Sequence, residues 1–137
     1  MLETIKTLVV DDDERFASNM VKLLRTQDID ASVAPNGAVA LEILAREAID
    51  VVLLDMKMPA PSGVETMRRI RDLGSTAQVI FLTGHASVDE ALAGLNLGAF
   101  DYVLKPASTE MIVGKIKLAY AKKQKLSRKE TEKGDPA

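Results

Sequence analysis

The chain has 137 residues, a length that suits one domain with its own hydrophobic core. Apolar residues make up 47% and charged residues 28%, as in an ordinary globular protein, and no apolar stretch approaches the length of a membrane span. The absence of cysteine excludes disulfides and thiolate metal sites, and the net charge of −2 gives no reason to expect direct nucleic-acid binding.

The two ends of the chain predict location and charge distribution. The first residues lack a basic region followed by a long apolar one, so we expect a cytoplasmic protein without a membrane partner. The stretch from Lys122 to Ala137 contains six Lys or Arg residues and three Asp or Glu residues. This basic end is either a partner-binding tail or, as is usual for short charged tails, a solvated one.

Short apolar runs alternate with segments of helical periodicity along the chain. We expect strands at 7–10, 31–34, 51–54, 78–82 and 102–104. A helix should follow each strand, with Asp13 at the start of the first, capping boxes at Ser62 and Ser87 for the third and fourth, and Ser108 near the start of the fifth. The side chains expected to face the core from these helices are Phe16, Met20, Leu23, Leu24, Val39, Leu41, Leu44, Ala45, Val64, Met67, Ile70, Leu73, Ala91, Leu92, Leu95, Ile112, Ile116 and Ala119.

This alternation predicts an α/β fold with a parallel sheet covered on both faces. Because crossovers between parallel strands are right-handed, the expected arrangement is a doubly wound (βα)5 three-layer sandwich with a five-stranded sheet. We expect the domain to span residues 4–122 and residues 123–137 to form a basic, polar and flexible C-terminal tail.

Polar side chains follow four of the five expected strands. They are Asp11 and Asp12 after the first, Asp55 after the third, Thr83 after the fourth and Lys105 after the fifth. Because the carboxyl ends of parallel strands meet at one edge, these side chains should share one crevice. Each also has an ordinary alternative, such as capping a helix or pairing with a nearby acid, but one shared site accounts for all of them together.

The residue types in this crevice favour phosphoryl transfer. Crowded carboxylates repel one another, and a hard divalent cation such as Mg²⁺, which prefers oxygen ligands, relieves that repulsion. His85 is the only histidine, so the sequence argues against zinc. A metal ion, a lysine and a hydroxyl group around a carboxylate supply the positioning and charge neutralisation that phosphoryl transfer needs.

Four segments of the sequence resemble the receiver domain of two-component response regulators. They are Leu8–Asp12, Asp55–Pro59 with Gly63, Leu82–Gly84 and Gly98–Pro106, and their order and spacing also agree. The resemblance implies a flavodoxin-like strand order of 2-1-3-4-5. Because no output domain follows in the sequence given, we expect either a single-domain receiver or a piece excised from a longer regulator.

The resemblance implies a role for each residue of the crevice. Asp55 is expected to be the phospho-acceptor, taking a phosphoryl group from a sensor histidine kinase or a phosphotransfer protein. Asp12 and Asp55 would bind Mg²⁺ directly, Asp11 through a water molecule and Lys57 through its backbone carbonyl. Such a protein is a signalling switch and not an enzyme, because it catalyses only its own phosphorylation and dephosphorylation.

The resemblance further implies a conformational switch. Lys105 is expected to pair with Asp55 and then with the phosphoryl oxygens, and the Lys105–Pro106 peptide bond is expected to be cis. Thr83 would move toward the phosphoryl group, and Tyr102 would turn from exposed to buried, unless it is an ordinary half-buried aromatic. The change would alter the face made by the fourth helix, fifth strand and fifth helix, for partner docking, homodimerisation or onward phosphotransfer.

Two residues and two alternatives remain open at this stage. Lys57 and His85 lie where receivers differ, and we hypothesise that both tune the lifetime of the phosphoryl group, although His85 could be merely a polar loop residue. Asp11 and Asp13 also have the spacing of a haloacid-dehalogenase-type phosphatase, but that fold would leave Asp55 without a role. The second alternative, and the third class of function considered, is a degenerate receiver that serves only as an interaction module.

Overall fold

The computed structural model describes residues 4–84 and 88–134, and the side chains of these residues as far as 128 apart from Val88. Within them, the strands are β1 (Lys6–Val10), β2 (Asp30–Ala34), β3 (Val51–Leu54), β4 (Gln78–Thr83) and β5 (Asp101–Leu104). The helices are α1 (Glu14–Thr26), α2 (Gly37–Arg46), α3 (Gly63–Asp72), α4 (Val88–Asn96) and α5 (Thr109–Gly134).

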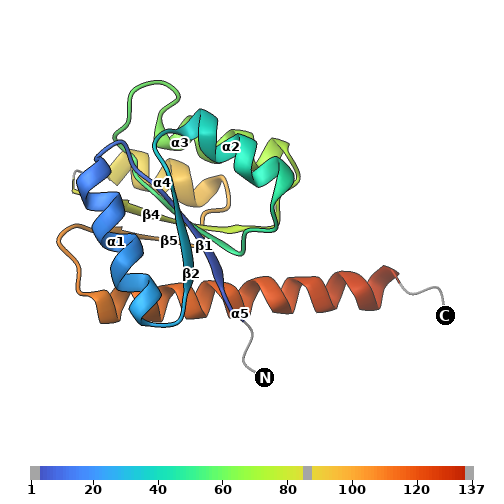
Figure 1. Cartoon of the computed structure of the whole chain (residues 1–137). Helices are drawn as coiled ribbons and strands as arrows, with labels where there is room; N and C mark the ends of the chain where they lie inside the picture. The colour runs from blue at the N-terminus through green and yellow to red at the C-terminus, as the bar shows by residue number, and fades with distance from the viewer. Residues whose placement is uncertain (1–3, 85–87, 135–137) are drawn as a thin grey trace.

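The strands form one parallel sheet in the order β2-β1-β3-β4-β5, which confirms the expected topology (Figure 1). Val10 at the end of β1 lies opposite Leu54 at the end of β3, and Thr83 at the end of β4 lies opposite Leu104 at the end of β5. This register aligns the carboxyl ends of the strands. The residues that follow the strands are therefore brought to one edge of the sheet.

Helices cover both faces of the sheet, and each face has its own core. Val9 packs with buried residues of α1 and α5, whereas its neighbours Leu8 and Val10 pack with those of α2, α3 and α4. Successive strand residues point to opposite faces, and here both faces are buried, as is usual in parallel sheets. The continuous apolar runs of the sequence follow from this arrangement.

Short-range hydrogen bonds start the helices near the expected positions. Asp13 caps α1 by accepting a hydrogen bond from the Phe16 backbone N–H at 3.1 Å, and Ser62 caps α3 by accepting one from the Glu65 backbone N–H at 3.2 Å. The Glu65 carboxylate pairs with Arg69 at 2.8 Å, where a capping box would turn it back toward the cap. The second expected box begins at Ser87, which lies outside the described residues.

Four side chains expected in the core are instead at the surface. Leu23, Leu73 and Leu92 are 44%, 50% and 52% exposed, and Ala45 is also exposed. Each lies in an apolar stripe at helical spacing, but a stripe is wider than the part of the helix that the packed layers cover. The prediction that these four side chains face the core was therefore wrong.

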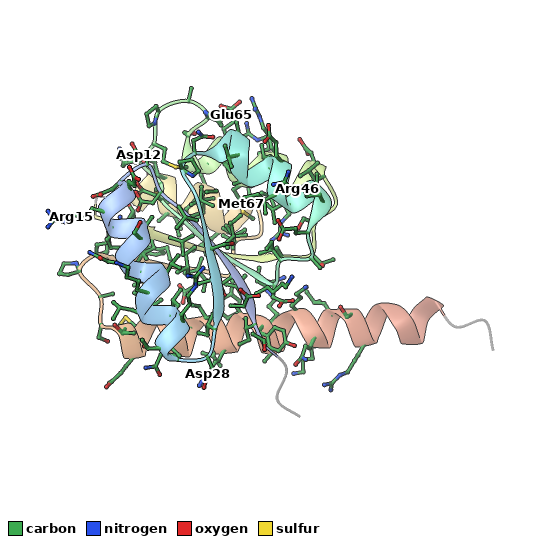
Figure 2. The ribbon with its side chains drawn as sticks, in the orientation of Figure 1. Asp12, Arg15, Asp28, Arg46, Glu65 and Met67 are labelled. Carbon is green, nitrogen blue, oxygen red and sulfur yellow. The ribbon has the colours of Figure 1, made fainter. Side chains whose placement is uncertain are left out.

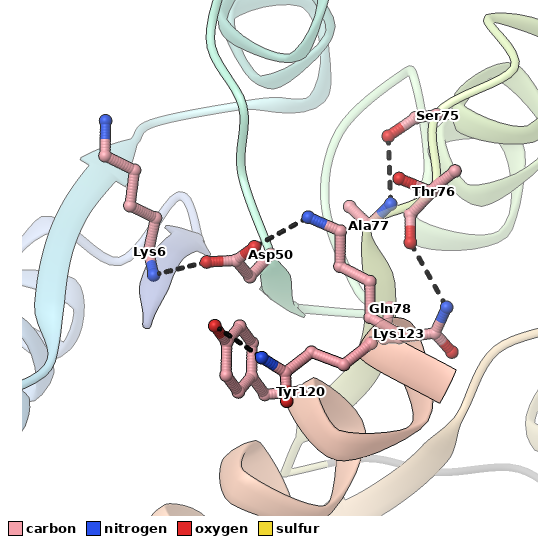
Figure 3. Close-up of polar contacts among 9 residues, drawn as sticks. Lys6, Asp50, Ser75, Thr76, Ala77, Gln78, Tyr120 and Lys123 are labelled. Atoms are coloured by element: carbon pink, nitrogen blue, oxygen red, sulfur yellow. Dashed lines mark hydrogen bonds and ion pairs between the residues drawn. The ribbon is translucent and has the colours of Figure 1, made fainter. Parts of the chain in front are cut away.

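Helix α5 continues to Gly134, so the residues expected to form a tail after Lys122 are helical in the structure (Figure 1). Residues such as Lys, Gln, Glu and Arg favour helices, and neither glycine nor proline interrupts the segment before Gly134. The Lys123 ammonium also bonds to Asp50 at 2.6 Å, and Asp50 accepts the Lys6 backbone N–H at 2.9 Å (Figure 3). Among the described helices, α5 included, none combines the length and the apolar character needed to cross a membrane.

Candidate functional site

The carboxyl-terminal edge of the sheet holds an acidic cluster. Carboxylate oxygens of Asp11, Asp12 and Asp55 lie within 4.8 Å of one another, as the sequence predicted. Asp11 and Asp55 are buried, whereas Asp12 is exposed beside the start of α1 (Figure 2). The cluster is therefore reachable from solvent on the Asp12 side.

Asp11 is held by hydrogen bonds to both of its carboxylate oxygens. Its Oδ1 accepts the Asp13 backbone N–H at 2.9 Å, and its Oδ2 accepts the Lys105 ammonium at 2.8 Å. The Asp11 side chain is only 2% exposed, so this ion pair is shielded from water on the Asp11 side. These two hydrogen bonds hold the Asp11 side chain in one orientation within the cluster.

Asp55 is less strongly stabilised as an anion. Burial raises the pKa of its carboxyl above the ordinary value, and the negative charges of Asp11 and Asp12 raise it further. The positive charge of Lys105 and a 3.3 Å hydrogen bond from the Lys57 backbone N–H lower the pKa in part. The ionised Asp55 thus lacks a full set of compensating partners, which is the condition that a bound cation would relieve.

Lys105 differs from the expectation, because its ammonium pairs with Asp11 and not with Asp55. Asp11 is the more deeply buried carboxylate, and pairing there satisfies its Oδ2. The Lys105 ammonium also lies 3.8 Å from the centre of the Phe16 ring. The Lys105–Pro106 peptide bond is cis, the form that the resemblance implies.

Phe16 is the residue of the site that the sequence analysis missed, since it was assigned only to the core. A signal for it existed. Phe16 lies in the first turn of α1, and helical side chains point back toward the N-terminal end of their helix. The N-terminal end of α1 lies at the edge of the sheet where Lys105 follows β5.

Two further residues frame the cluster. Thr83 ends β4 and is 1% exposed, and its carbonyl accepts the Lys105 backbone N–H at 2.8 Å. The Lys57 ammonium pairs with the Glu90 carboxylate of α4 at 2.9 Å. His85, proposed with Lys57 as a tuning residue, lies outside the described residues.

The donor set fits Mg²⁺. Three carboxylates offer only hard oxygen ligands, and one of them is exposed, which leaves room for the water molecules that Mg²⁺ retains. Burial and, after it, the negative charges of Asp11 and Asp12 raise the pKa of Asp55, and a bound divalent cation would offset both effects. These residues suit magnesium better than zinc, which favours nitrogen and sulfur ligands.

Comparison with known proteins identifies the family. The family model described as "Response regulator receiver domain" matches residues 7–117. The chain belongs to this family. Receiver domains are parts of the response regulators of two-component systems.

Curated relatives agree with this identification of the receiver. The chain is 34% identical to the response regulator MprA of Mycobacterium leprae over 113 residues, which are 82% of this chain and 50% of that protein. It is 35% identical to YkoG of Bacillus subtilis, an uncharacterized transcriptional regulatory protein, over 112 residues, 82% of this chain and 49% of that one. The receiver therefore spans about half the length of these relatives.

Solved receiver structures share the fold. A CheY-like receiver from Methanospirillum hungatei superposes with a TM-score of 0.85 at 26% identity, covering 90% of this chain and 98% of that one. One from Clostridium thermocellum gives 0.84 at 34% identity, covering 89% and 98%. A response regulator from Burkholderia pseudomallei, solved with a phosphorylated aspartic acid, calcium ion and citrate, gives 0.77 at 27% identity, covering 90% and 72%.

Family membership removes the phosphatase alternative, which rested on the spacing of Asp11 and Asp13 after the first strand and on Thr83 and Lys105 as likenesses of its later motifs. In the structure Asp13 caps α1 through its Oδ1. It is not among the carboxylates that gather with Asp55. Asp55, to which the phosphatase alternative gave no role, is a member of the acidic cluster.

A groove lies between β5 and the start of α5, on part of the surface expected to dock partners. Its volume is about 640 Å³, and it is lined by residues of β5 and the start of α5, including Tyr102, Leu104 and Met111. Tyr102 is 38% exposed, and Leu104 and Met111 are each 52% exposed. This exposure fits both a switch residue and an ordinary half-buried aromatic, so the role of Tyr102 stays a prediction.

Proposed function

We propose that this receiver accepts a phosphoryl group on Asp55 from a histidine kinase or a phosphotransfer protein. The observation that carries the proposal is the gathering of Asp11, Asp12 and Asp55 within 4.8 Å, with the Lys105 ammonium bonded to the cluster. A carboxylate oxygen of Asp55 would attack phosphorus while the bond from phosphorus to the donor breaks. The related Burkholderia pseudomallei structure contains a phosphorylated aspartic acid, which supports this chemistry.

The residues that would hold Mg²⁺ are Asp12 and Asp55 directly, Asp11 through a water molecule and Lys57 through its backbone carbonyl. Mg²⁺, when bound, supplies positive charge for the oxygens of the transferring phosphoryl group. The buried carboxylate of Asp11 holds Lys105 at the edge of the cluster, from which its ammonium would turn to a phosphoryl oxygen. Asp55 must be ionised to attack, and the neighbouring positive charges promote that state.

The resulting switch would act through Thr83 and Tyr102. Thr83 ends the strand next to β5, so a movement of its hydroxyl toward the phosphoryl group would open space on the side of Tyr102. Burial of Tyr102 would then reshape the groove between β5 and α5. This change would control partner docking, dimerisation or onward phosphotransfer through the α4-β5-α5 surface.

The protein would therefore be a cytoplasmic switch that catalyses only its own phosphorylation and dephosphorylation. The lifetime of the phosphoryl group would depend on Lys57 and His85, which follow Asp55 and Thr83 by two residues. Alanine at either position should change the rate of dephosphorylation. Unchanged rates in both variants would remove this part of the proposal.

Intact mass after incubation with acetyl phosphate and Mg²⁺ tests the proposal. The protein should gain one phosphoryl group, and the gain should be absent without Mg²⁺ and in Asp55→Asn. If acetyl phosphate, which needs no kinase, does not phosphorylate the protein although Mg²⁺ binds, the interaction-module alternative gains support. A gain that persists in Asp55→Asn would place the acceptor on another residue.

A further inference from the structure

The Lys105 ammonium is held by two groups at once. It lies 2.8 Å from Asp11 Oδ2 and 3.8 Å from the centre of the Phe16 ring. The Lys105 side chain is 21% exposed, so both contacts form in a largely water-excluded position. A cation over an aromatic face is attracted to it, and the attraction grows as water is removed.

We infer that Phe16 is a positioning residue that holds Lys105 on Asp11 in the unphosphorylated receiver. This inference rests on the proposed function, in which Lys105 moves from Asp11 to a phosphoryl oxygen on Asp55. The structure shows the ring against the ammonium in the first of these two arrangements, and a turn of the ammonium toward Asp55 would draw it away from the ring. Phe16 therefore stabilises the unphosphorylated form and opposes the step that recruits Lys105 to the phosphoryl group.

The location of Phe16 supports this role over simple core packing. Phe16 is only partly buried and packs at the border of the core formed by α1 and α5. Asp13 caps α1 by accepting the Phe16 backbone N–H at 3.1 Å, which fixes the start of the helix from which the ring projects. A leucine at position 16 would fill the same border but would offer no aromatic face to Lys105.

The chain contains a matched control for this contact. The Lys122 ammonium lies 5.7 Å from the centre of the Phe100 ring, and Phe100 packs at the border of the same core. Phe100→Leu therefore removes an aromatic face and an ammonium contact of the same kind without touching the acidic cluster. Phe16→Tyr, which retains the face, provides the conservative rescue.

The first readout is the NMR signal of the Lys105 Cε protons in the unphosphorylated, magnesium-free protein, assigned with Lys105→Arg. A ring face over the ammonium shifts these protons upfield. The shift should persist in Phe16→Tyr and Phe100→Leu and disappear in Phe16→Leu. An unchanged Lys105 signal in Phe16→Leu would overturn the inference, whatever the outcome of phosphorylation.

The second readout is the rate of phosphorylation by acetyl phosphate with Mg²⁺, followed by intact mass. Phe16→Leu should react about two- to tenfold faster than wild type, a range set by the usual strength of such contacts. Phe16→Tyr and Phe100→Leu should react at the wild-type rate. An equal or slower rate in a folded Phe16→Leu would contradict the inference, whereas no reaction in any protein would contradict the proposed function and leave the NMR result to decide the contact.

Discussion

Asp55 combines a raised pKa with a position among other carboxylates, and this has a measurable consequence for stability. Burial is the main cause of the raised pKa, followed by the charge of Asp11. The folded protein therefore binds the Asp55 proton more tightly than the unfolded chain does. The resulting stability is complete at pH values below the ordinary aspartate pKa and is lost as the pH rises through the raised pKa of the folded state.

We predict that Asp55→Asn unfolds at a higher temperature than wild type at pH 7 in the presence of a chelator. The difference should shrink as the pH falls toward 4, because wild-type Asp55 then becomes neutral. Added Mg²⁺ should stabilise wild type, by about 2.7 kcal/mol at a concentration 100 times the dissociation constant, and should stabilise the variant less. Thermal unfolding by circular dichroism measures both effects, and equal stability of the two proteins at pH 7 would contradict this account of Asp55.

The sequence identified which polar residues gather at the site but not how they pair. The strand ends placed Asp11, Asp55 and Lys105 together because parallel strands share an edge. The choice of Asp11 as the partner of Lys105 depends on side-chain burial and on the ring of Phe16, which lies on a separate element. Such a choice is a property of packing and has no counterpart in the spacing of the sequence.

At the scale of elements, α4 is tied to its neighbours at both ends. The Lys57 ammonium, two residues after Asp55, pairs with Glu90 in the first turn of α4 at 2.9 Å. At the other end, the Arg71 guanidinium of α3 donates to the carbonyls of Leu97 and Gly98 at 3.3 and 2.7 Å. A change near Asp55 can therefore act on the start of α4 while its end stays attached to α3.

We predict that Glu90→Gln lengthens the phosphoryl lifetime about two- to fivefold, a limit set by the modest strength of exposed ion pairs. Without Glu90, the Lys57 ammonium is available to the phosphoryl group and obstructs the approach of water. Glu65→Gln is the control, because Glu65 forms an exposed ion pair with Arg69 away from the site. The decay of the phosphorylated mass after removal of acetyl phosphate measures the lifetime, and an unchanged or faster decay would count against this role of Glu90.

The types and order of the elements could be predicted from the sequence, because apolar runs and helical stripes differ in period. The strands were also placed to within one residue at each end. The apolar stripes wrongly predicted burial of Leu23, Ala45, Leu73 and Leu92, since periodicity shows which face of a helix is apolar but not how much of that face is covered. Only the assembled layers decide that.

At the scale of the whole molecule, the long helix α5 is attached to the sheet at the edge opposite the acidic cluster. Asp50, just before β3, accepts the Lys123 ammonium at 2.6 Å and the Lys6 backbone N–H at 2.9 Å (Figure 3). The polar composition after Lys122 favoured a tail, because it lacks the apolar residues of a core. The ion pair with Asp50, 73 residues away in the chain, is invisible to that argument.

We predict that Asp50→Asn lowers the free energy of unfolding by about 1–3 kcal/mol, because a partly buried ammonium loses its charged partner. Asp30→Asn, at an exposed position of β2, is the matched control and should change stability by less than about 0.5 kcal/mol. Urea unfolding measures both. If the two variants proved equally stable, the contact between Asp50 and Lys123 would not support α5.

The central claim is that Asp55 is the residue that takes the phosphoryl group. The most direct measurement is reduction of the acetyl phosphate-treated protein with borohydride, which converts a phosphorylated aspartate into homoserine, followed by peptide mass spectrometry. The account predicts homoserine at position 55 and only in samples that received Mg²⁺. Homoserine at position 11, 12 or 13, with an unmodified Asp55, would contradict it.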